Sequence, residues 1–333
     1  MVRNRYGKIL KALVATLLVA LFIAAWGRAS AAPTGSVTYK DKLGRSVVVP
    51  LPVRRAVFLI SYDLVPVLGV WDRVVGVARW AYDNDIVRQS KPDIRSIPSM
   101  GSGTDVNIEA LLKLKPDLVV TWTFKPELVR FVEERGLRVI AIYPESLPEL
   151  YEVMRLYGRI FEREARMERA IGEMEGIFRM VKERVARIPD NQRKKVLYLG
   201  SKPTIVSGAV GVTNDMITLI GARNPASVLK QRNIEVPLER IIEWNPDTVI
   251  IWGNARYPAS DLINDPQWRL IPSVRKGRVY KSPEWNTWSP RLAPFALWMA
   301  AKTYPEQFRD IDMDRVIDDF HRKVFGVSGK AWH

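Results

Sequence analysis

The sequence of 333 residues contains no cysteine and only two histidines, His321 and His333. Without cysteine the chain can form neither a disulfide framework nor a lipid-modified cysteine behind a leader. A zinc or manganese site rich in histidine is also disfavoured, because both histidines lie near the C-terminus and far in sequence from any predicted strand end. We therefore expect no metal ion bound directly by protein side chains, and no resident cofactor.

Sequence motifs of several enzyme classes are missing as well. The chain has no G-x-S-x-G motif, no P-loop and no G-x-G-x-x-G that opens a helix after a strand, since GSGTDV (101–106) lacks the third glycine. A cleft without histidine also lacks the commonest general base. We expect a protein without catalytic activity. An exported α/β enzyme, a hydrolase or an oxidoreductase, is the alternative.

The first 31 residues have the order of a secretory leader. Basic residues between positions 3 and 11 precede an uncharged apolar run over 12–26, and small residues end at Ala31. The run is shorter than the roughly 20 residues that a membrane-spanning helix needs. We expect 1–31 to be a signal peptide, with a retained membrane anchor as the alternative, and the mature protein to be periplasmic or otherwise extracytoplasmic.

The charge of the chain is strongly positive. There are 51 Lys and Arg against 36 Asp and Glu, a formal net charge of +15. Five of the basic residues lie in the leader, which leaves 46 basic against 36 acidic residues and a net charge of +10 for the mature chain. Export argues against nucleic acid as a partner, so this charge favours an anionic small ligand. Much of it lies in segments of mixed sign, which are typical of a solvated face.

Short apolar runs alternate with helical patterns on both sides of a long helical stretch. The first half contains AVFLI, RVVGVA, DLVVTW and RVIAIYP, and the second half contains KVLYLG, PTIVSG, DTVIIW and GRVYKSP. Such runs between amphipathic helices are typical of mostly parallel sheets covered on both faces. We predict an α/β fold with two Rossmann-like lobes, residues 32–145 and 190–333, and a ligand cleft between them.

Residues 146–189 are predicted to join the lobes as a long, rigid helical connector. Ser146 and Glu149 have the spacing of a capping box, and apolar residues then recur at helical intervals. The apolar stripe loses phase at 162–164, where we predict a break into two helices. The second helix, of about 24 residues, would span roughly 36 Å and allow only small lobe movements.

One motif occurs twice in the sequence. EALLKLKPDLVVTW (109–122) and ERIIEWNPDTVIIW (239–252) share the first glutamate, a Pro-Asp pair and the final tryptophan at a constant offset of 130 residues. This period is the size of a domain and not of a stacked repeat. Each Pro-Asp pair is predicted to end a helix and begin a buried strand. One such unit is therefore expected in each lobe.

Five segments resemble the helix-linked substrate-binding proteins of ABC importers, which deliver ferric siderophores, haem or cobalamin to a permease. They follow one another in the family's order, with the long connector after the second, and cover nearly the whole mature chain: DKLGRSVVVPLPVRRAVFL (41–59), VNIEALLKLKPDLVV (106–120), LIGARNPA (219–226), VPLERIIEWNPDTVII (236–251) and DPQWRLIPSVRKGRVYKSP (265–283).

This resemblance implies a periplasmic monomer that captures a small-molecule metal chelate and delivers it to a dimeric ABC permease in the inner membrane. The arginines and the positive charge favour an anionic iron chelate such as a ferric siderophore, while citrate complexes, haem and cobalamin remain alternatives. A ligand-sensing adaptor that presents its loaded form to a membrane receptor would share the fold.

The resemblance also implies a role for the glutamate of each motif copy. In such proteins each lobe carries a surface glutamate that docks with arginines on one half of the permease, and Glu109 and Glu239 occupy these positions. Two like carboxylates suit a two-fold symmetric cationic surface. The alternative is that each carboxylate only stabilises the start of its helix, by about 0.3 to 1 kcal/mol.

Residues that follow the predicted strands form the candidate ligand site, because ligands of open α/β sheets bind beyond the carboxyl ends of the strands. Aromatic and arginine side chains dominate this set and suit a large, flat or anionic ligand. The candidates are Tyr62, Arg79, Trp80, Tyr82, Trp122, Asn254, Arg256, Trp285, Trp288 and Arg291, with Ser61, Phe124, Ser201, Tyr257 and Glu284 beside them in sequence.

The segment EWNTWSPRLAPFALWMA (284–300) carries three of these candidates. Pro290 is predicted to be the first residue of a helix, which places Arg291 in the first turn, where a cation opposes the helix dipole. Its compensating anion is either the ligand or a nearby acid such as Glu284. Trp285 and Trp288 flank a turn and are predicted to line the pocket.

The other tryptophans are assigned by their place in the pattern. Trp298 lies on a helical stripe and is predicted to be core. Trp122 and Trp252 end strands, where a tryptophan can either close the core or line the site.

Overall fold

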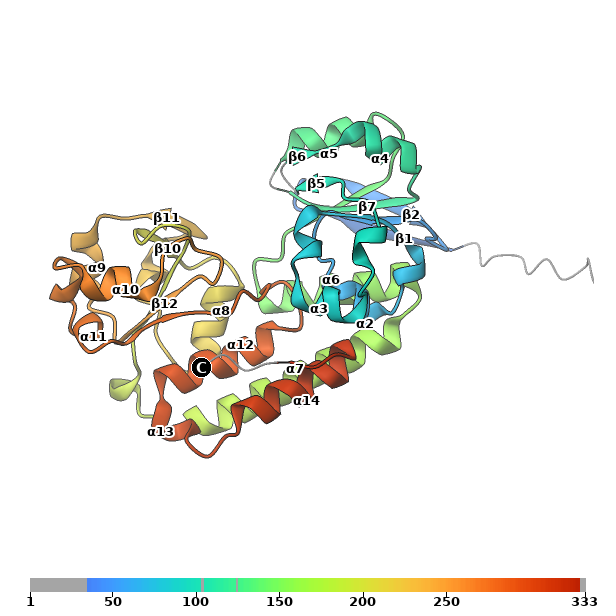
Figure 1. The fold of residues 1–333 in the computed structure, drawn as a ribbon. Helices are drawn as coiled ribbons and strands as arrows, with labels where there is room; N and C mark the ends of the chain where they lie inside the picture. The colour runs from blue at the N-terminus through green and yellow to red at the C-terminus, as the bar shows by residue number, and fades with distance from the viewer. Residues whose placement is uncertain (1–34, 103–104, 124, 330–333) are drawn as a thin grey trace, which may run out of the picture.

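A computed structural model describes residues 35–102, 105–123 and 125–329. The predictions for the signal peptide, Phe124 and His333 lie outside these residues. The described chain folds as two α/β lobes joined by long helices that run beneath both (Figure 1). None of its described helices combines the length and the apolar character that crossing a membrane requires.

The first lobe is built on a four-stranded parallel sheet with the order β4-β3-β7-β8. All side chains of β3 and β8 are buried. This is the expected pattern for parallel strands covered on both faces. The strands are β3 (Ala56–Phe58), β4 (Val74–Val77), β7 (Leu118–Trp122) and β8 (Val139–Ile142), beside two antiparallel pairs, β1 (Ser36–Lys40) with β2 (Ser46–Pro50) and β5 (Gly101–Ser102) with β6 (Asp105–Val106).

Short helices cover this sheet. They are α2 (Leu64–Leu68), α3 (Asp85–Ser90), α4 (Ile108–Leu114) and α5 (Pro126–Glu133), with the 3₁₀ turns η1 (Trp71–Arg73), η2 (Arg79–Tyr82) and η3 (Ile94–Ser96).

The second lobe has a five-stranded mixed sheet with the order β11-β10-β9-β12-β13. β9, β12 and β13 are parallel, whereas β10 and β11 add an antiparallel hairpin at one edge. The strands are β9 (Val196–Leu199), β10 (Ile205–Ser207), β11 (Asn233–Glu235), β12 (Thr248–Ile251) and β13 (Val279–Lys281), and the helices are α8 (Val212–Leu219), α9 (Leu238–Trp244), α10 (Ala259–Asn264), α11 (Pro272–Arg275), η4 (Asp190–Gln192), η5 (Pro225–Val228) and η6 (Trp268–Leu270).

The connector consists of α6 (Leu147–Phe161) and α7 (Glu164–Val185), so the predicted break is confirmed. Ser146 caps α6, because its Oγ accepts a hydrogen bond from Glu149 N at 3.3 Å. Glu162 ends α6 in the left-handed conformation, with φ of 58°. Helices α12 (Leu292–Thr303), α13 (Pro305–Phe308) and α14 (Met313–Phe325) pack against α7 (Figure 1).

The hydrophobic core ties the lobes to this helical layer. One cluster of buried side chains runs from the first sheet through α6 and α7 to α12 and α14, and it includes Trp298. The prediction for Trp298 is therefore confirmed. Two smaller clusters cover the other faces of the two sheets. The duplicated motif forms α4 with β7 in one lobe and α9 with β12 in the other, as the sequence predicts.

Candidate functional site

The candidates on the first lobe gather in part. Trp80, which is 40% exposed, makes an edge contact with the half-buried Trp122, with ring centroids 6.1 Å apart. Arg79 beside them is exposed. Tyr82 is held within its own lobe, because its hydroxyl donates to Ile97 O at 2.7 Å. Tyr62 is half-buried against the core, and burial raises the pKa of its hydroxyl.

The candidates after β12 lie on the second lobe. Asn254 and Arg256 are exposed, and so is Trp252, at 38%. Tyr257 is half-buried and its hydroxyl donates to Gly200 O at 3.0 Å, which closes the end of β9. Trp252, Asn254 and Arg256 therefore face solvent in this structure, where they are available to a ligand.

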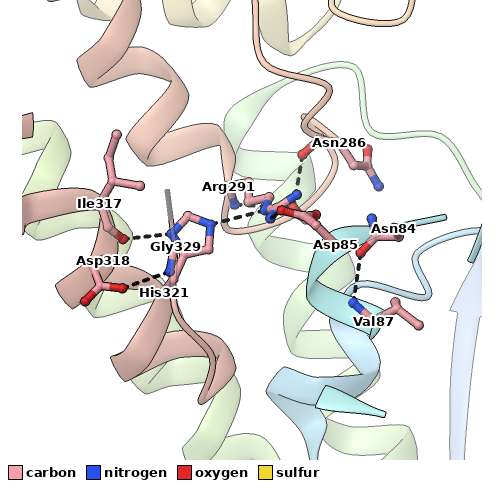
Figure 2. A network of polar contacts seen from close by, with 10 residues as sticks. Asn84, Asp85, Val87, Asn286, Arg291, Ile317, Asp318, His321 and Gly329 are labelled. Carbon is pink, nitrogen blue, oxygen red and sulfur yellow. Dashed lines mark hydrogen bonds and ion pairs between the residues drawn. The ribbon is translucent and has the colours of Figure 1, made fainter. Parts of the chain in front are cut away.

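Arg291 is a buried member of a polar network that joins the two lobes (Figure 2). Its Nη2 contacts Asp85 Oδ2 of α3 at 2.5 Å, and its Nε donates to His321 Nε2 of α14 at 3.2 Å. Burial opposes the charge on Asp85, but the bond and charge of Arg291 outweigh it and lower the pKa of that carboxyl. Of the two anions predicted for Arg291, the structure has the nearby acid, and that acid is Asp85 and not Glu284.

Helix α12 starts at Leu292, two residues later than predicted, and Arg291 stands at its N-cap. The hydroxyl of Ser289 accepts a hydrogen bond from Arg291 N at 3.3 Å, which ends the preceding loop. Arg291 therefore opposes the helix dipole from the cap position, and Asp85 supplies the compensating charge.

His321 lies beside Arg291, although the two residues are 30 positions apart in the sequence. Its Nδ1 is 2.7 Å from Ile317 O, so Nδ1 carries the proton and Nε2 accepts from Arg291. Burial, together with the charge of Arg291, lowers the pKa of His321 to about 4. Trp285, which follows β13, packs on this ring with centroids 5.5 Å apart and is only 4% exposed. The structure thus places Trp285 in the core and not on an open pocket wall.

A second contact fixes the same loop to the first lobe. Asp63 is fully buried at the start of α2, and its Oδ1 accepts from Asn286 Nδ2 at 3.3 Å. Asn286 in turn accepts from Trp288 N at 2.9 Å. Burial raises the pKa of Asp63 to about 6, although Ser289, Arg291 and Asn286 favour its charged form. The loop 285–291 belongs to the second lobe in sequence but is anchored on the first.

Two residues that sequence reasoning missed meet Trp288 between the lobes. The Arg232 guanidinium carbon lies 4.6 Å from the Tyr143 ring centroid and 4.8 Å from that of Trp288, and the two rings are 5.1 Å apart. Buried Arg232 Nη1 and Trp288 Nε1 have no hydrogen-bond partner, and Arg232 forms no ion pair, within the described part of the chain. Trp288 is 6% exposed, so it packs at this junction and does not line an open wall as predicted.

The start of α8 lies against Arg232. A Cβ on Gly211, the residue that caps this helix at φ of 115°, would lie 3.4 Å from Arg232 Cγ. No side chain caps α8, and Asp215 in its first turn accepts from Leu147 N at 2.7 Å, which ties α8 to α6. The start of α8 and the ring of Trp288 therefore both lie beside the Arg232 side chain, an arrangement that can hold an anion.

Tyr143 directly follows β8, so the strand-end rule applied to that strand would have found it. Arg232 precedes β11, a three-residue strand with two exposed side chains that leaves no apolar run in the sequence.

Glu109 and Glu239 are equivalent in the two lobes. Each is the second residue of its helix, α4 or α9, and each is exposed. Glu109 pairs with Lys113 Nζ at 2.6 Å, and its side chain is 79% exposed. The two helices lie on different lobes, away from α7 (Figure 1). Both carboxylates can therefore reach a partner.

Other features do not point to a metal or to a second site near the strand ends. Within the described residues, no three His, Asp or Glu side chains are grouped as a metal site would require. A cavity of about 370 Å³ lies at the opposite end of β3, lined by Pro52, Arg54, Asp72, Arg73 and Glu162.

A family model described as periplasmic binding protein matches residues 56–284. The chain belongs to this family. Among curated relatives, this periplasmic binding protein is similar to the molybdate-binding protein MolA of Haemophilus influenzae, with 26% identity over 87% of this chain and 91% of MolA. It is 23% identical to the haem uptake protein IsdE of Staphylococcus aureus, over 57% of this chain and 68% of IsdE.

A solved structure of Helicobacter pylori CeuE with Ni(II) bound superposes with a TM-score of 0.79, at 28% identity over 88% of this chain and 97% of CeuE.

Proposed function

We propose that the protein is the solute-binding component of an ABC importer in the periplasm, and that its solute is an anionic metal species held between the lobes. The observation that carries this proposal is the pair of buried nitrogens without a hydrogen-bond partner, Arg232 Nη1 and Trp288 Nε1, beside the start of α8, which no side chain caps. Of the ten candidates from the sequence, Trp288 belongs to this set, and Arg291 anchors the loop that carries Trp288.

An anion is the ligand that these donors suit best. A buried donor without a partner costs about 1 to 3 kcal/mol, and more when it is charged. The two aromatic neighbours of Arg232 attract a cation but accept no strong hydrogen bond. An anionic solute would satisfy Arg232 Nη1 and Trp288 Nε1 together, and a neutral solute would leave the charge uncompensated.

Two members of this class are candidates. The first is the anionic iron chelate expected from the sequence, which the exposed aromatic pair Trp80 and Trp122 could cover. The second is a compact oxyanion, because MolA is named for molybdate, and burial of Trp285 and Trp288 leaves less aromatic surface for a large flat ligand.

The binding experiment uses the mature protein and isothermal titration with molybdate, sulfate, nickel with histidine, ferric citrate, a catecholate and a hydroxamate ferric siderophore, haem and cobalamin. We expect one anionic metal species to bind and Arg232→Met to weaken it, while the matched control Arg256→Met changes affinity less. Preferred binding of cobalamin, or equal loss in both variants, would contradict an anion site at Arg232.

The docking part of the proposal assigns Glu109 and Glu239 to the permease. Their equivalent, exposed positions on two lobes support it, because a two-fold symmetric partner needs two like groups. The double variant Glu109→Ala with Glu239→Ala is expected to abolish uptake while leaving solute affinity intact. Weaker solute binding in this variant would show that the glutamates serve the lobes and not the permease.

A further inference from the structure

Helices α4 and α9 carry Glu109 and Glu239. In each lobe, the residue that precedes the first strand of the sheet holds the carboxyl end of this helix. Arg55, before β3, donates from Nη2 to Leu114 O at 2.6 Å. Lys195, before β9, donates from Nζ to Trp244 O at 3.0 Å. Leu114 and Trp244 are the last residues of α4 and α9. The same contact is therefore made in both lobes, by different cations.

The aspartate of each Pro-Asp pair completes this arrangement. Asp117 Oδ2 accepts from the backbone N–H groups of Arg54 and Arg55, both at 2.8 Å, and Asp247 Oδ2 accepts from Lys195 N at 2.8 Å. In the opposite direction, the backbone N–H of Asp117 donates to Arg55 O at 2.8 Å, and that of Asp247 donates to Lys195 O at 2.9 Å. The Pro-Asp pairs thus do more than end a helix, because their carboxylates fasten it to the neighbouring strand.

The likeness extends beyond the duplicated motif. The motif repeats at an offset of 130 residues, whereas Arg55 and Lys195 are 140 positions apart, so a constant offset does not relate them. Both helices also end on a residue other than glycine in the left-handed conformation, Lys115 and Asn245, each with φ of 46°. The two lobes share the contact although their sequences differ around it.

We propose that these two clasps, Arg55 with Asp117 and Lys195 with Asp247, are positioning groups that aim Glu109 and Glu239 at the permease; this inference rests on the proposed docking function. α4 and α9 have seven residues each, too few to be stable alone. A cation at the last carbonyl of a helix is favoured by the helix dipole. It also donates a hydrogen bond to a carbonyl that has no donor within the helix.

Each glutamate lies five residues from the clasped carbonyl, roughly 7.5 Å along the helix axis. If the helix tilts about its clasped carboxyl end, the glutamate changes position while the strands of the sheet beneath the helix do not move. The clasps act on docking through this lever and do not touch the solute.

The first experiment measures the aim of the helices directly. The chain contains no cysteine, so Glu109→Cys with Glu239→Cys introduces the only two nitroxide-labelling sites. Electron–electron double resonance then gives the distribution of distances between the labels. We expect Arg55→Met with Lys195→Met to widen this distribution. The neighbouring charge losses Arg54→Met with Lys194→Met, and the conservative pair Arg55→Lys with Lys195→Arg, should leave it narrow.

The second experiment measures capture of the protein, with its glutamates intact, by the source organism's permease in lipid nanodiscs. We expect the dissociation constant to rise on the order of tenfold in Arg55→Met with Lys195→Met. Solute affinity should stay unchanged, and the conservative pair should restore capture. If the clasps had only a structural role, their removal would not lower the affinity for the permease while leaving the affinity for the solute unchanged.

The outcomes distinguish the two proposals. If Glu109→Ala with Glu239→Ala abolishes capture but removal of the clasps changes neither the distance distribution nor capture, the clasp proposal alone is wrong. If the glutamate variant is captured normally, the docking function is wrong and the clasps have no docking group to position.

Discussion

Arg291 and Arg232 are both arginines between the lobes, and each lies against a tryptophan of the loop 285–291. Arg291 has its anion already, in Asp85, and gives a further hydrogen bond to His321. Arg232 has aromatic rings on two sides and no acid paired with it in the described chain, whereas a buried Nη1 without a hydrogen-bond partner is common to both arginines. The difference indicates that the first arginine supports the structure and that the second is available to a solute.

Burial explains why the two arginines differ in role. The Arg291 side chain is 2% exposed, and an ionised group so far from water is tolerated only when a charge and hydrogen bonds compensate it. If the compensating anion were a ligand that binds and dissociates, the charge of Arg291 would be uncompensated whenever the site is empty. At Arg232, stacking on two rings and partial exposure make the empty state tolerable.

Removing the anion of Arg291 should have the largest effect of the changes considered. Asp85→Ala removes the acid paired with a buried guanidinium, and we expect the free energy of unfolding to fall by about 3 kcal/mol, the low end of the cost of breaking a buried pair, because Asp85 itself is 55% exposed and water can replace part of the interaction. Denaturant titration measures this, with the exposed neighbour in Asp83→Ala as a control that should lose little. A loss of solute affinity in folded Asp85→Ala, without a loss of stability, would move Arg291 into the binding site.

The fold could be predicted because its signals are local. Buried apolar runs and the phase of the apolar stripe on the connector are determined by residues close in sequence, so α6, α7, the break at Glu162 and the strands of the two main sheets other than β11 followed from them. β11 could not be found in this way, because it is an edge strand with exposed side chains at Asn233 and Glu235. Without that hairpin, nothing in the sequence brings Arg232 to the junction.

The roles of individual site residues depended on contacts that sequence spacing does not contain. Arg291 and Asp85 are 206 positions apart, and Asn286 and Asp63 are 223 apart. The strand-end rule found the correct loops, but it could not tell which arginine in them already has an acid. The exposed positions of Glu109 and Glu239, by contrast, were implied by the family resemblance, and the structure has each glutamate in the first turn of its helix.

Asp63 faces Arg291 and the loop 285–291, and its titration makes the stability of the folded protein depend on pH. Its pKa is about 6 in the folded protein, above the ordinary aspartate value of 3.8. Between these two values the folded state binds more protons than the unfolded state. The stabilising contribution is therefore complete below pH 3.8 and is lost as the pH rises through about 6.

Asp63→Asn imitates the protonated carboxyl at every pH. We expect its stability relative to the wild type to rise between pH 4 and pH 7 by roughly 3 kcal/mol, since one pKa unit corresponds to about 1.4 kcal/mol. Urea titrations of both proteins across this range measure the difference. His321, whose lowered pKa has the opposite effect, is common to both proteins and cancels. A constant difference between them would mean that Asp63 is charged throughout, held by Arg291.

Arg232→Met should have the smallest effect on stability and the most specific effect on binding. Methionine keeps the apolar packing between Tyr143 and Trp288 and removes only the charge and the donors, so we expect the free energy of unfolding to change by less than about 1 kcal/mol. Loss of a hydrogen bond to a charged group, worth about 1.5 to 3 kcal/mol, should weaken the anionic solute roughly 10- to 100-fold. Titration with the solute identified for the wild type measures this. Unchanged affinity in Arg232→Met, together with lost affinity in Asp85→Ala, would reverse the roles of the two arginines.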